Sequence, residues 1–183
     1  MILLKEMISR SLFAESKVKK LRIFDFDDTV VKTKALVYVT NTKTGKEFEL
    51  TPAQYAVYKP KGGDEFDYSD FRNIKEPTEI KQVTSVLKRM SKRSDGDLFI
   101  LTARAAYKPI KEYLNTIGVR NIYVVALDSA DPQDKADWIE DKVDNEGYND
   151  IYFIDDSPKN VRAVKEMLRT KEGIKWRVQH AKY

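Results

Sequence analysis

The sequence predicts an α/β fold, namely a doubly wound, Rossmann-like parallel sheet of about five strands with helices on both faces. Short hydrophobic runs recur along the chain, and segments with helical periodicity separate them. Most of the runs are apolar throughout, without the alternation of polar and apolar residues that a half-exposed strand shows. A continuously apolar strand is typical of a parallel sheet that is buried on both faces.

Five hydrophobic runs are the predicted strands, and the first four end in polar residues. They cover residues 21–26, 97–101, 121–127, 150–154 and 175–179. Four other segments place apolar residues three or four positions apart, as one face of a helix requires. These predicted helices cover residues 79–93, 107–117, 134–144 and 157–169. Pro158 stands at the first-turn position of the last helix, where proline is favoured.

One segment, residues 34–76, interrupts this alternation within what we expect to be a single domain over residues 1–183. An alternating run, a turn and a second run at 46–50 predict a β-hairpin in it. A loop of this length inside a compact domain is usually a lid or an inserted cap. Its tyrosines and phenylalanines would either stack on a bound base or form a small core of the insertion. Residues 1–16 predict an N-terminal helix that packs on the domain or binds a partner.

The composition excludes several kinds of chemistry. The chain has no cysteine, which excludes disulfides, thiol nucleophiles and cysteine-bound zinc. Its one histidine, His180, leaves almost no residues for a histidine-dependent triad or a two-histidine metal site. An enzyme of this composition would use carboxylates, hydroxyls and lysines with an oxygen-bound hard cation. With 42% hydrophobic and 34% charged residues and no apolar run of ~20 residues, we expect a globular cytoplasmic protein without membrane contact. A net charge of +4 weakly favours anionic partners.

Polar residues gather where the predicted strands end. The carboxyl ends of parallel strands meet at one edge of the sheet, so these residues should converge there. They are Asp25, Asp27, Thr102, Asp128, Asp155 and Asp156. Clustered carboxylates would repel one another unless a cation neutralised them, and Mg²⁺ prefers such a set of oxygen ligands. Lys135 could hold both the first carboxylate and an anionic substrate oxygen. The residues therefore predict a magnesium–carboxylate site that handles phosphate.

Four motifs in this order resemble those of the haloacid-dehalogenase-like hydrolases. Residues 25–29 (DFDDT) follow a hydrophobic strand and resemble the family's DxDxT motif. Thr102 closes a hydrophobic strand, as in the second motif, and Lys135 stands twenty residues before Asp155, as in the third. Asp155 and Asp156 resemble the acidic fourth motif. The resemblance covers most of the chain outside the insertion and implies a Rossmann-like fold.

The resemblance also implies catalytic roles. Asp25 would be the nucleophile that forms an aspartyl-phosphate. Asp27 would protonate the leaving oxygen and later activate water, and an aspartate at this second position is typical of the family's phosphatase branches. Thr102 and backbone N–H groups of the first loop would bind phosphoryl oxygens, while Lys135 would balance charge in the transition state.

The ligands of the metal and of the substrate follow from the same resemblance. Mg²⁺ would be held by the Asp25 carboxylate, the Asp27 carbonyl and Asp156. Asp155 would ligate the ion directly or act through water. Asp28 and Thr29 are the candidate substrate-binding residues of the first loop, although Thr29 is expected mainly to orient that loop.

Two residues resemble the 3′-phosphatase domain of phage polynucleotide kinase-phosphatases in particular. Arg104 follows the second motif, and Asp131 precedes Lys135 by four residues, as in that domain. Arg104 would contact substrate or cap the following helix, and Asp131 would act in the site or cap its own helix. The arginine that the resemblance leads us to expect about eleven residues after the nucleophile is absent, because that position is Leu36.

These observations predict a Mg²⁺-dependent phosphomonoester phosphatase. Its substrate would be a nucleotide or a nucleic-acid terminal phosphate. The alternatives are a phosphoprotein or small-metabolite phosphatase, a phosphoryl transferase with another acceptor, and a non-catalytic binding module that kept the fold. Basic residues at 17–22 and 88–93 would be a nucleic-acid-binding face or ordinary solvated surface.

Overall fold

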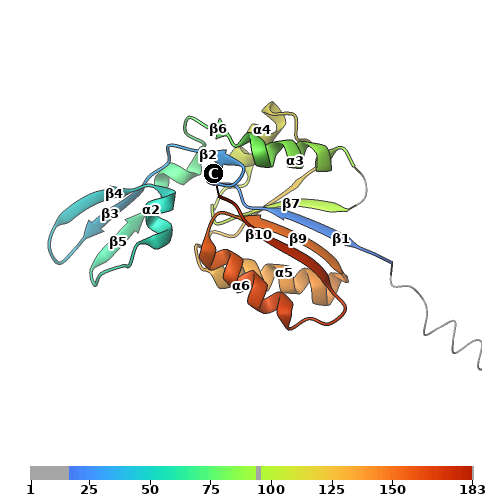
Figure 1. Cartoon of the computed structure of the whole chain (residues 1–183). Coiled ribbons are helices and arrows are strands. Elements are labelled where there is room, and N and C mark those ends of the chain that lie inside the picture. The colour runs from blue at the N-terminus through green and yellow to red at the C-terminus, as the bar shows by residue number, and fades with distance from the viewer. Residues whose placement is uncertain (1–16, 94–95, 183) are drawn as a thin grey trace, which may run out of the picture.

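A five-stranded parallel sheet forms the centre of the molecule. The computed structural model describes residues 17–93 and 96–182. The strand order is β10-β9-β1-β7-β8, and every neighbouring pair is parallel (Figure 1). The strands are β1 (Lys20–Phe24), β7 (Asp97–Thr102), β8 (Tyr123–Ala126), β9 (Asp150–Asp155) and β10 (Lys175–His180). The prediction of an α/β fold with five parallel strands is confirmed, whereas the helix expected over residues 1–16 lies outside the described residues.

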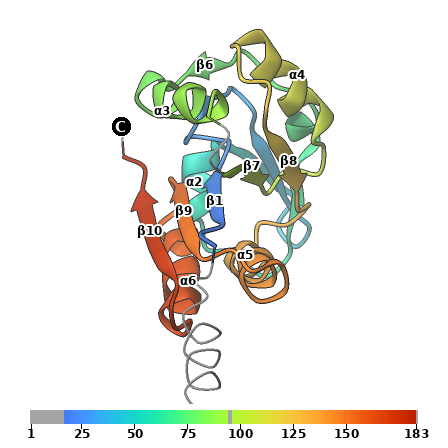
Figure 2. The same cartoon turned by 90° about the vertical axis from the view of Figure 1, so that its right-hand side faces the viewer.

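Helices cover both faces of this sheet (Figure 2). One face carries α3 (Lys81–Ser91) and α4 (Lys108–Thr116), and the other carries α5 (Pro132–Glu146) and α6 (Pro158–Arg169). Each pair of helices contributes to a separate apolar core against its own face. The side chains of a strand alternate between the two cores, so Phe24 lies in the first and Ile23 in the second. This arrangement is compatible with a Rossmann-like fold.

Two helices begin with a capping side chain, although α5 begins at Pro132, two residues before its predicted start at 134. The Ser157 side chain accepts a hydrogen bond from the Asn160 N–H at the start of α6, and Pro158 occupies the first turn. The Asp131 side chain accepts from the Gln133 N–H at the start of α5, which bears out the helix-capping role considered for Asp131. Both caps satisfy backbone N–H groups that have no partner within the helix.

The third predicted strand differs from its expected environment. Its apolar run predicts burial on both faces, but β8 is the edge strand of the sheet and has no fully buried residue. Tyr123, at its start, is 59% exposed and stacks on Phe99 of the neighbouring strand. The expectation of burial was wrong for β8 because an apolar run does not reveal whether a second strand will pair with its outer side.

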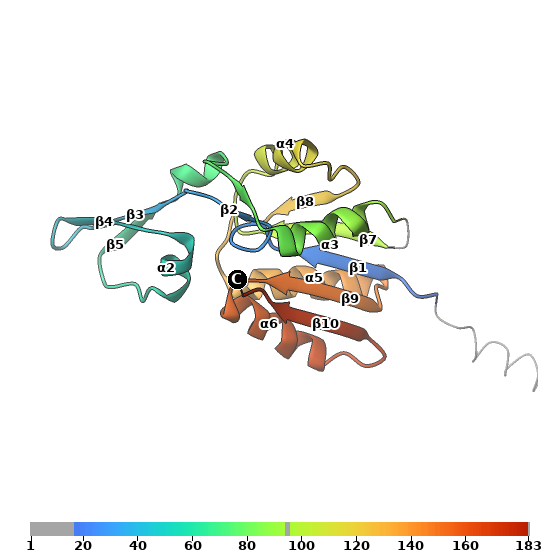
Figure 3. The same ribbon diagram turned by 45° about the horizontal axis from the view of Figure 1, so that its top comes forward.

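The insertion forms a second, antiparallel sheet. Its strands β3 (Val37–Asn41), β4 (Lys46–Leu50) and β5 (Asp64–Asp67) have the order β4-β3-β5, and β3 and β4 form a hairpin as predicted. Its base is the antiparallel pair of β2 (Val31–Lys32) and β6 (Thr78–Glu79). Figures 1 and 3 place the insertion beyond the carboxyl ends of the parallel strands, where ligands bind in such sheets.

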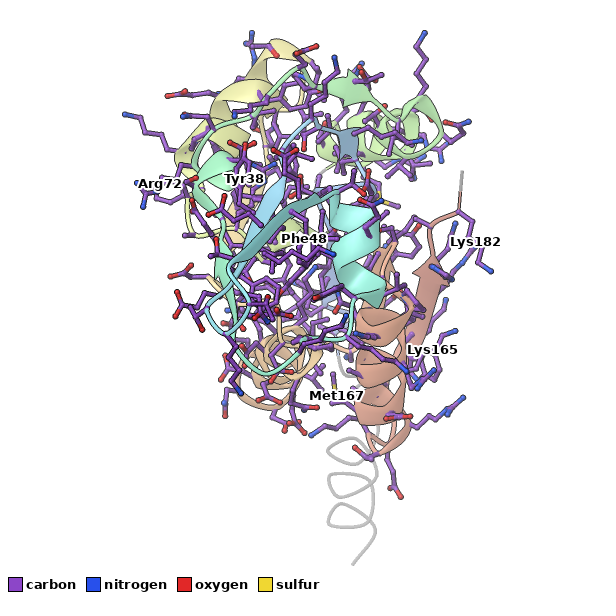
Figure 4. The ribbon with its side chains drawn as sticks, turned by 90° about the vertical axis from the view of Figure 1, so that its left-hand side faces the viewer. Tyr38, Phe48, Arg72, Lys165, Met167 and Lys182 are labelled. Carbon is purple, nitrogen blue, oxygen red and sulfur yellow. The ribbon has the colours of Figure 1, made fainter. Side chains whose placement is uncertain are left out.

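The aromatic residues of the insertion mainly form its own core. Val37, Val39 and Leu50 are buried there, and five aromatic side chains pack against them. These are Phe48, Tyr55, Tyr58, Phe66 and Phe71. The short helix α2 (Pro52–Val57) brings Tyr55 to one face of the sheet, and the 3₁₀ helix η1 (Ser69–Arg72) leads back towards β6. Figure 4 looks onto the insertion, with Phe48 within its sheet.

None of the helices in the described parts of the chain combines the length and the apolar character that crossing a membrane requires.

Candidate active site

The candidate site lies at the point of the sheet where the order of the strands along the chain changes direction. From β1 the chain proceeds to β7 and β8, and it then returns through α5 to β9 on the other side of β1. The carboxyl ends of the neighbouring strands β1 and β9 therefore form a topological switch point, which is the usual ligand position in an open parallel sheet. Asp25 follows β1 and Asp155 ends β9, and the Asp25 N–H donates to the Ile154 carbonyl at 2.9 Å.

Three carboxylates meet at this switch point. One oxygen from each of Asp25, Asp155 and Asp156 lies within 4.8 Å of the others. Asp25 is 6% exposed, and Asp155 is fully buried. Three of the five aspartates expected to converge thus form one group. The group is a candidate site for a hard cation because all its donor atoms are carboxylate oxygens.

Lys135 lies between two of these carboxylates. Its Nζ donates to Asp25 Oδ1 at 2.7 Å and to Asp155 Oδ2 at 2.8 Å, and its side chain is 3% exposed. The predicted contact between Lys135 and the first carboxylate is therefore present. One ammonium beside three carboxylates leaves a formal charge of −2 in a buried place, which a divalent cation would neutralise.

The pKa values in the cluster are shifted by burial and by the neighbouring charges. Burial raises the pKa of Asp25 well above its ordinary value, and Asp155 and Asp156 add to this, while Lys135 opposes it. Burial and the carboxylates of Asp155 and Asp28 raise the pKa of Asp156 to about 7. Burial alone would lower the pKa of Lys135, but the two carboxylates beside it raise that pKa above its usual range. Lys135 is therefore the permanent positive charge of the site.

Asp155 and Asp156 differ in how many hydrogen bonds their carboxylates already accept. The Asp155 oxygens accept from Lys135, from the Ser157 N–H at 2.8 Å and from Asn160 Nδ2 at 3.0 Å. In the described parts of the chain, the Asp156 carboxylate accepts one side-chain hydrogen bond, from Thr29 Oγ1 at 3.4 Å. Asp156 therefore has more free lone pairs for a metal ion than Asp155 has.

Sequence reasoning missed two residues that support this group. Asn160 holds the Asp155 carboxylate, and His180 Nε2 lies 2.7 Å from the carbonyl oxygen of Asp156. Asn160 stands three residues after the capping Ser157, so its side chain faces back towards the strand end. That position within the first turn was the available sequence signal. His180 is brought near by the pairing of β10 with β9, which its position in the sequence does not reveal.

The first loop is tied to the same group. Thr29 is fully buried, and its Oγ1 accepts from the Asp156 N–H at 3.0 Å. This contact agrees with the expectation that Thr29 orients the loop. Asp28 has a positive φ of 52°, and its N–H donates to the Val31 carbonyl at 2.8 Å, which closes the turn. A left-handed backbone at a residue other than glycine is uncommon and marks a tightly constrained loop.

Thr102 ends β7 and is 1% exposed. Its Oγ1 accepts from the Arg104 N–H at 3.2 Å, so its hydroxyl proton remains to be donated. Asp128 does not join the carboxylate group. It is exposed at the end of β8, and its N–H donates to the Arg104 carbonyl at 3.3 Å.

Asp27 makes a separate ion pair. Arg104 Nε donates to Asp27 Oδ2 at 2.8 Å and Nη2 donates to Oδ1 at 2.7 Å, so the guanidinium binds the carboxylate with both edges of a fork. The expected cap on the following helix is not made by Arg104, because the N-cap of α4 is Tyr107 without a side-chain hydrogen bond. A contact of Arg104 with substrate would have to compete with this ion pair.

Comparisons of the chain with protein-family models, with curated proteins and with solved structures found no match. The geometry of the site therefore has to support any functional assignment.

Proposed function

We propose that this protein is a Mg²⁺-dependent phosphomonoester phosphatase of the haloacid-dehalogenase-like family, acting through an aspartyl-phosphate. The observation that carries the proposal is the buried carboxylate group at the switch point, with the Lys135 ammonium between Asp25 and Asp155. A carboxylate beside a lysine and a cation site suits a nucleophile that attacks phosphorus, since positive charges there stabilise the phosphoryl oxygens.

The donor set fits Mg²⁺. We expect the carboxylates of Asp25 and Asp156 and the Asp27 carbonyl to hold the ion, because Asp155 already accepts several hydrogen bonds. When bound, the ion supplies charge neutralisation for the carboxylates and the phosphoryl group. The residual negative charge of the cluster is the physical reason to expect a cation there.

The residues of the chain would carry out two chemical steps. In the first, an Asp25 oxygen bonds to phosphorus, the bond to the leaving oxygen breaks, and Asp27 gives that oxygen a proton. In the second, Asp27 takes a proton from water, the water oxygen bonds to phosphorus, and phosphate leaves while the Asp25 carboxylate is restored. Thr102 and the N–H groups of the first loop would hold the phosphoryl oxygens, and Lys135 would balance their charge.

The test of this proposal is hydrolysis of p-nitrophenyl phosphate with Mg²⁺ and with EDTA. We expect turnover that EDTA abolishes, and we expect Asp25→Asn to lower kcat by roughly 10³-fold or more because it removes the nucleophile. Asp137→Asn is the matched control, since Asp137 is exposed on the same helix as Lys135 and contacts Gln133. Activity retained by Asp25→Asn would exclude the aspartyl-phosphate, and an inactive wild type would favour a non-catalytic binding module.

For the substrate we propose a nucleotide or a nucleic-acid terminal phosphate. This choice rests on the likeness of the motif around Arg104 to that of a 3′-phosphatase domain and on the positive net charge of the chain, and it does not require Arg104 to contact the substrate. A panel of 5′- and 3′-mononucleotides, 3′-phosphate oligonucleotides, sugar phosphates and phosphopeptides tests it through kcat/KM. Highest kcat/KM for a sugar phosphate or a phosphopeptide would replace this substrate class.

A further inference from the structure

Arg104 is the most completely engaged buried cation among the described residues. Its side chain is 2% exposed, and each of its five N–H groups has an acceptor. Nε and one Nη2 hydrogen bind the Asp27 carboxylate, and the second Nη2 hydrogen points to Thr33 Oγ1 at 3.4 Å. Nη1 donates to the carbonyls of Phe71 at 3.0 Å and Asn73 at 2.8 Å.

These acceptors belong to two different parts of the molecule. Asp27 lies in the loop after β1, whereas Phe71 and Asn73 lie where the insertion ends. Thr33 lies where the insertion begins, immediately after β2. One guanidinium therefore joins the aspartate to both ends of the insertion.

The plane of the guanidinium is fixed in the same way. The Phe71 ring of the insertion lies 4.9 Å from Arg104 Cζ, and the Phe26 ring of the first loop lies 5.6 Å from it. A planar group held by two rings and five acceptors has little freedom to turn. It has no N–H left for a substrate oxygen unless one of these bonds is broken.

We infer that Arg104 is a positioning residue that couples the placement of the insertion to the orientation of the Asp27 carboxylate. Both Asp27 oxygens are bound by the guanidinium, so an oxygen can turn towards a leaving group only as the guanidinium shifts. The guanidinium shifts with the carbonyls at 71 and 73. A substrate that displaces the insertion therefore changes the setting of the acid–base residue. The catalytic part of this inference rests on the proposed function, whereas the mechanical coupling does not.

A kinetic experiment tests the catalytic part. Arg104→Ala should lower kcat for phenyl phosphate by about 10²-fold and lower kcat for p-nitrophenyl phosphate much less, because a better leaving group needs less protonation. KM should change little. Arg104→Lys should behave like Arg104→Ala, because an ammonium cannot bind both carboxylate oxygens and two carbonyls in one plane. The double variant with Asp27→Asn should be no slower than Asp27→Asn alone. Equal losses for both esters, a raised KM, or additive losses would overturn the inference in favour of direct substrate contact.

Hydrogen exchange tests the coupling without relying on activity. In Arg104→Ala we expect faster amide exchange both at residues 69–73 and at residues 27–33, and Asp27→Asn should speed exchange at 69–73. Arg72→Ala is the control, because Arg72 is the exposed neighbour of Phe71 and lies at the outline of the molecule in Figure 4. Unchanged exchange at 69–73 would overturn the coupling, whatever the activity.

The two experiments separate the two proposals. Faster exchange in a protein without phosphatase activity would leave the coupling intact and defeat the proposed function. A wild type that is an active phosphatase, together with unchanged exchange at residues 69–73 in Arg104→Ala, would support the proposed function and defeat the coupling. If Arg104→Ala no longer unfolds cooperatively, Arg104→Lys and Asp27→Asn decide the coupling by the same measurement.

Discussion

Two charged clusters lie on the loop that follows β1, and they differ in what supports them. Asp25 is held by the parallel sheet and its helices, namely by Lys135 of α5 and by the Ile154 carbonyl of β9. Asp27 is held by Arg104, and Arg104 depends in turn on two carbonyls of the insertion. The first cluster is therefore part of the scaffold, while the second spans two structural units.

This difference separates the fixed parts of the site from the adjustable one. The proposed nucleophile and the carboxylates of the candidate metal site lie at the ends of β1 and β9, where the sheet can set their geometry before substrate arrives. The proposed acid–base residue is set by a unit that extends beyond the sheet. Variants that affect one cluster and spare the other can test whether the clusters are independent.

The largest effect is expected in the scaffold cluster. Lys135→Ala would leave the Asp25 and Asp155 carboxylates buried without their ammonium partner, which typically costs about 3–5 kcal/mol. The free energy of unfolding in urea with EDTA measures this loss. Mg²⁺ should recover part of it, since the ion supplies the missing positive charge.

Lys142→Ala provides the matched control for Lys135→Ala. Lys142 lies on the same helix and pairs with Glu146 one turn away, a contact worth only about 0.2–0.5 kcal/mol. Similar losses in the two variants would show that the buried group is not held together by Lys135. An unfolding loss in Lys135→Ala that Mg²⁺ does not reduce would count against a cation at the three carboxylates.

The two clusters also differ in how far the sequence predicts them. The scaffold cluster follows from strands that end in aspartate and from a lysine on the preceding helix, because parallel pairing brings those ends together. The ion pair of Asp27 with Arg104 had no such signal. Two further acceptors of Arg104 are the backbone carbonyls of Phe71 and Asn73, and any residue type presents a carbonyl. The position of an insertion relative to a sheet is a tertiary property that local patterns do not encode.

A pH dependence of intermediate size is expected from Asp156. The pKa of Asp156 is about 7 in the folded chain against an ordinary value of 3.8. Between these two pH values the folded state therefore holds a proton that the unfolded chain has lost. This contribution to stability is complete below about pH 4 and is lost as the pH rises through 7. At about 1.4 kcal/mol per pKa unit, the loss is roughly 2–4 kcal/mol without metal.

Unfolding of the wild type and of Asp156→Asn between pH 4 and pH 8 measures this loss. Asp156→Asn cannot ionise there, so its stability in EDTA should fall less than that of the wild type. Mg²⁺ should reduce the wild-type loss and leave the variant nearly unchanged, because a bound cation favours the ionised carboxylate. Parallel pH curves in EDTA would mean that Asp156 stays ionised without metal.

The smallest effects are expected around Asp70 in η1, and they test the comparison most directly. Asp70 is 8% exposed and accepts hydrogen bonds from the Leu36 N–H, from Tyr38 Oη and from Lys75 Nζ. Asp70→Ala removes three acceptor contacts next to Phe71 and should cost about 1–3 kcal/mol. The cost should fall on local opening of the insertion, so exchange at residues 36–38 should quicken while the urea midpoint shifts little.

Lys75→Ala should show a weaker form of the Asp70→Ala effect. Its side chain is 49% exposed, so losing it should cost less than about 1 kcal/mol, because Asp70 keeps its two other donors. Lys34→Ala is the reference, since Lys34 and Glu76 are both about 70% exposed and their pair should contribute almost nothing. Quicker exchange in Asp70→Ala that extends to residues 27–33 would carry the disturbance through Arg104 to Asp27. Exchange confined to the insertion would instead make the ion pair of Asp27 independent of the segment whose carbonyls accept hydrogen bonds from Arg104, and the two clusters would then belong to one scaffold.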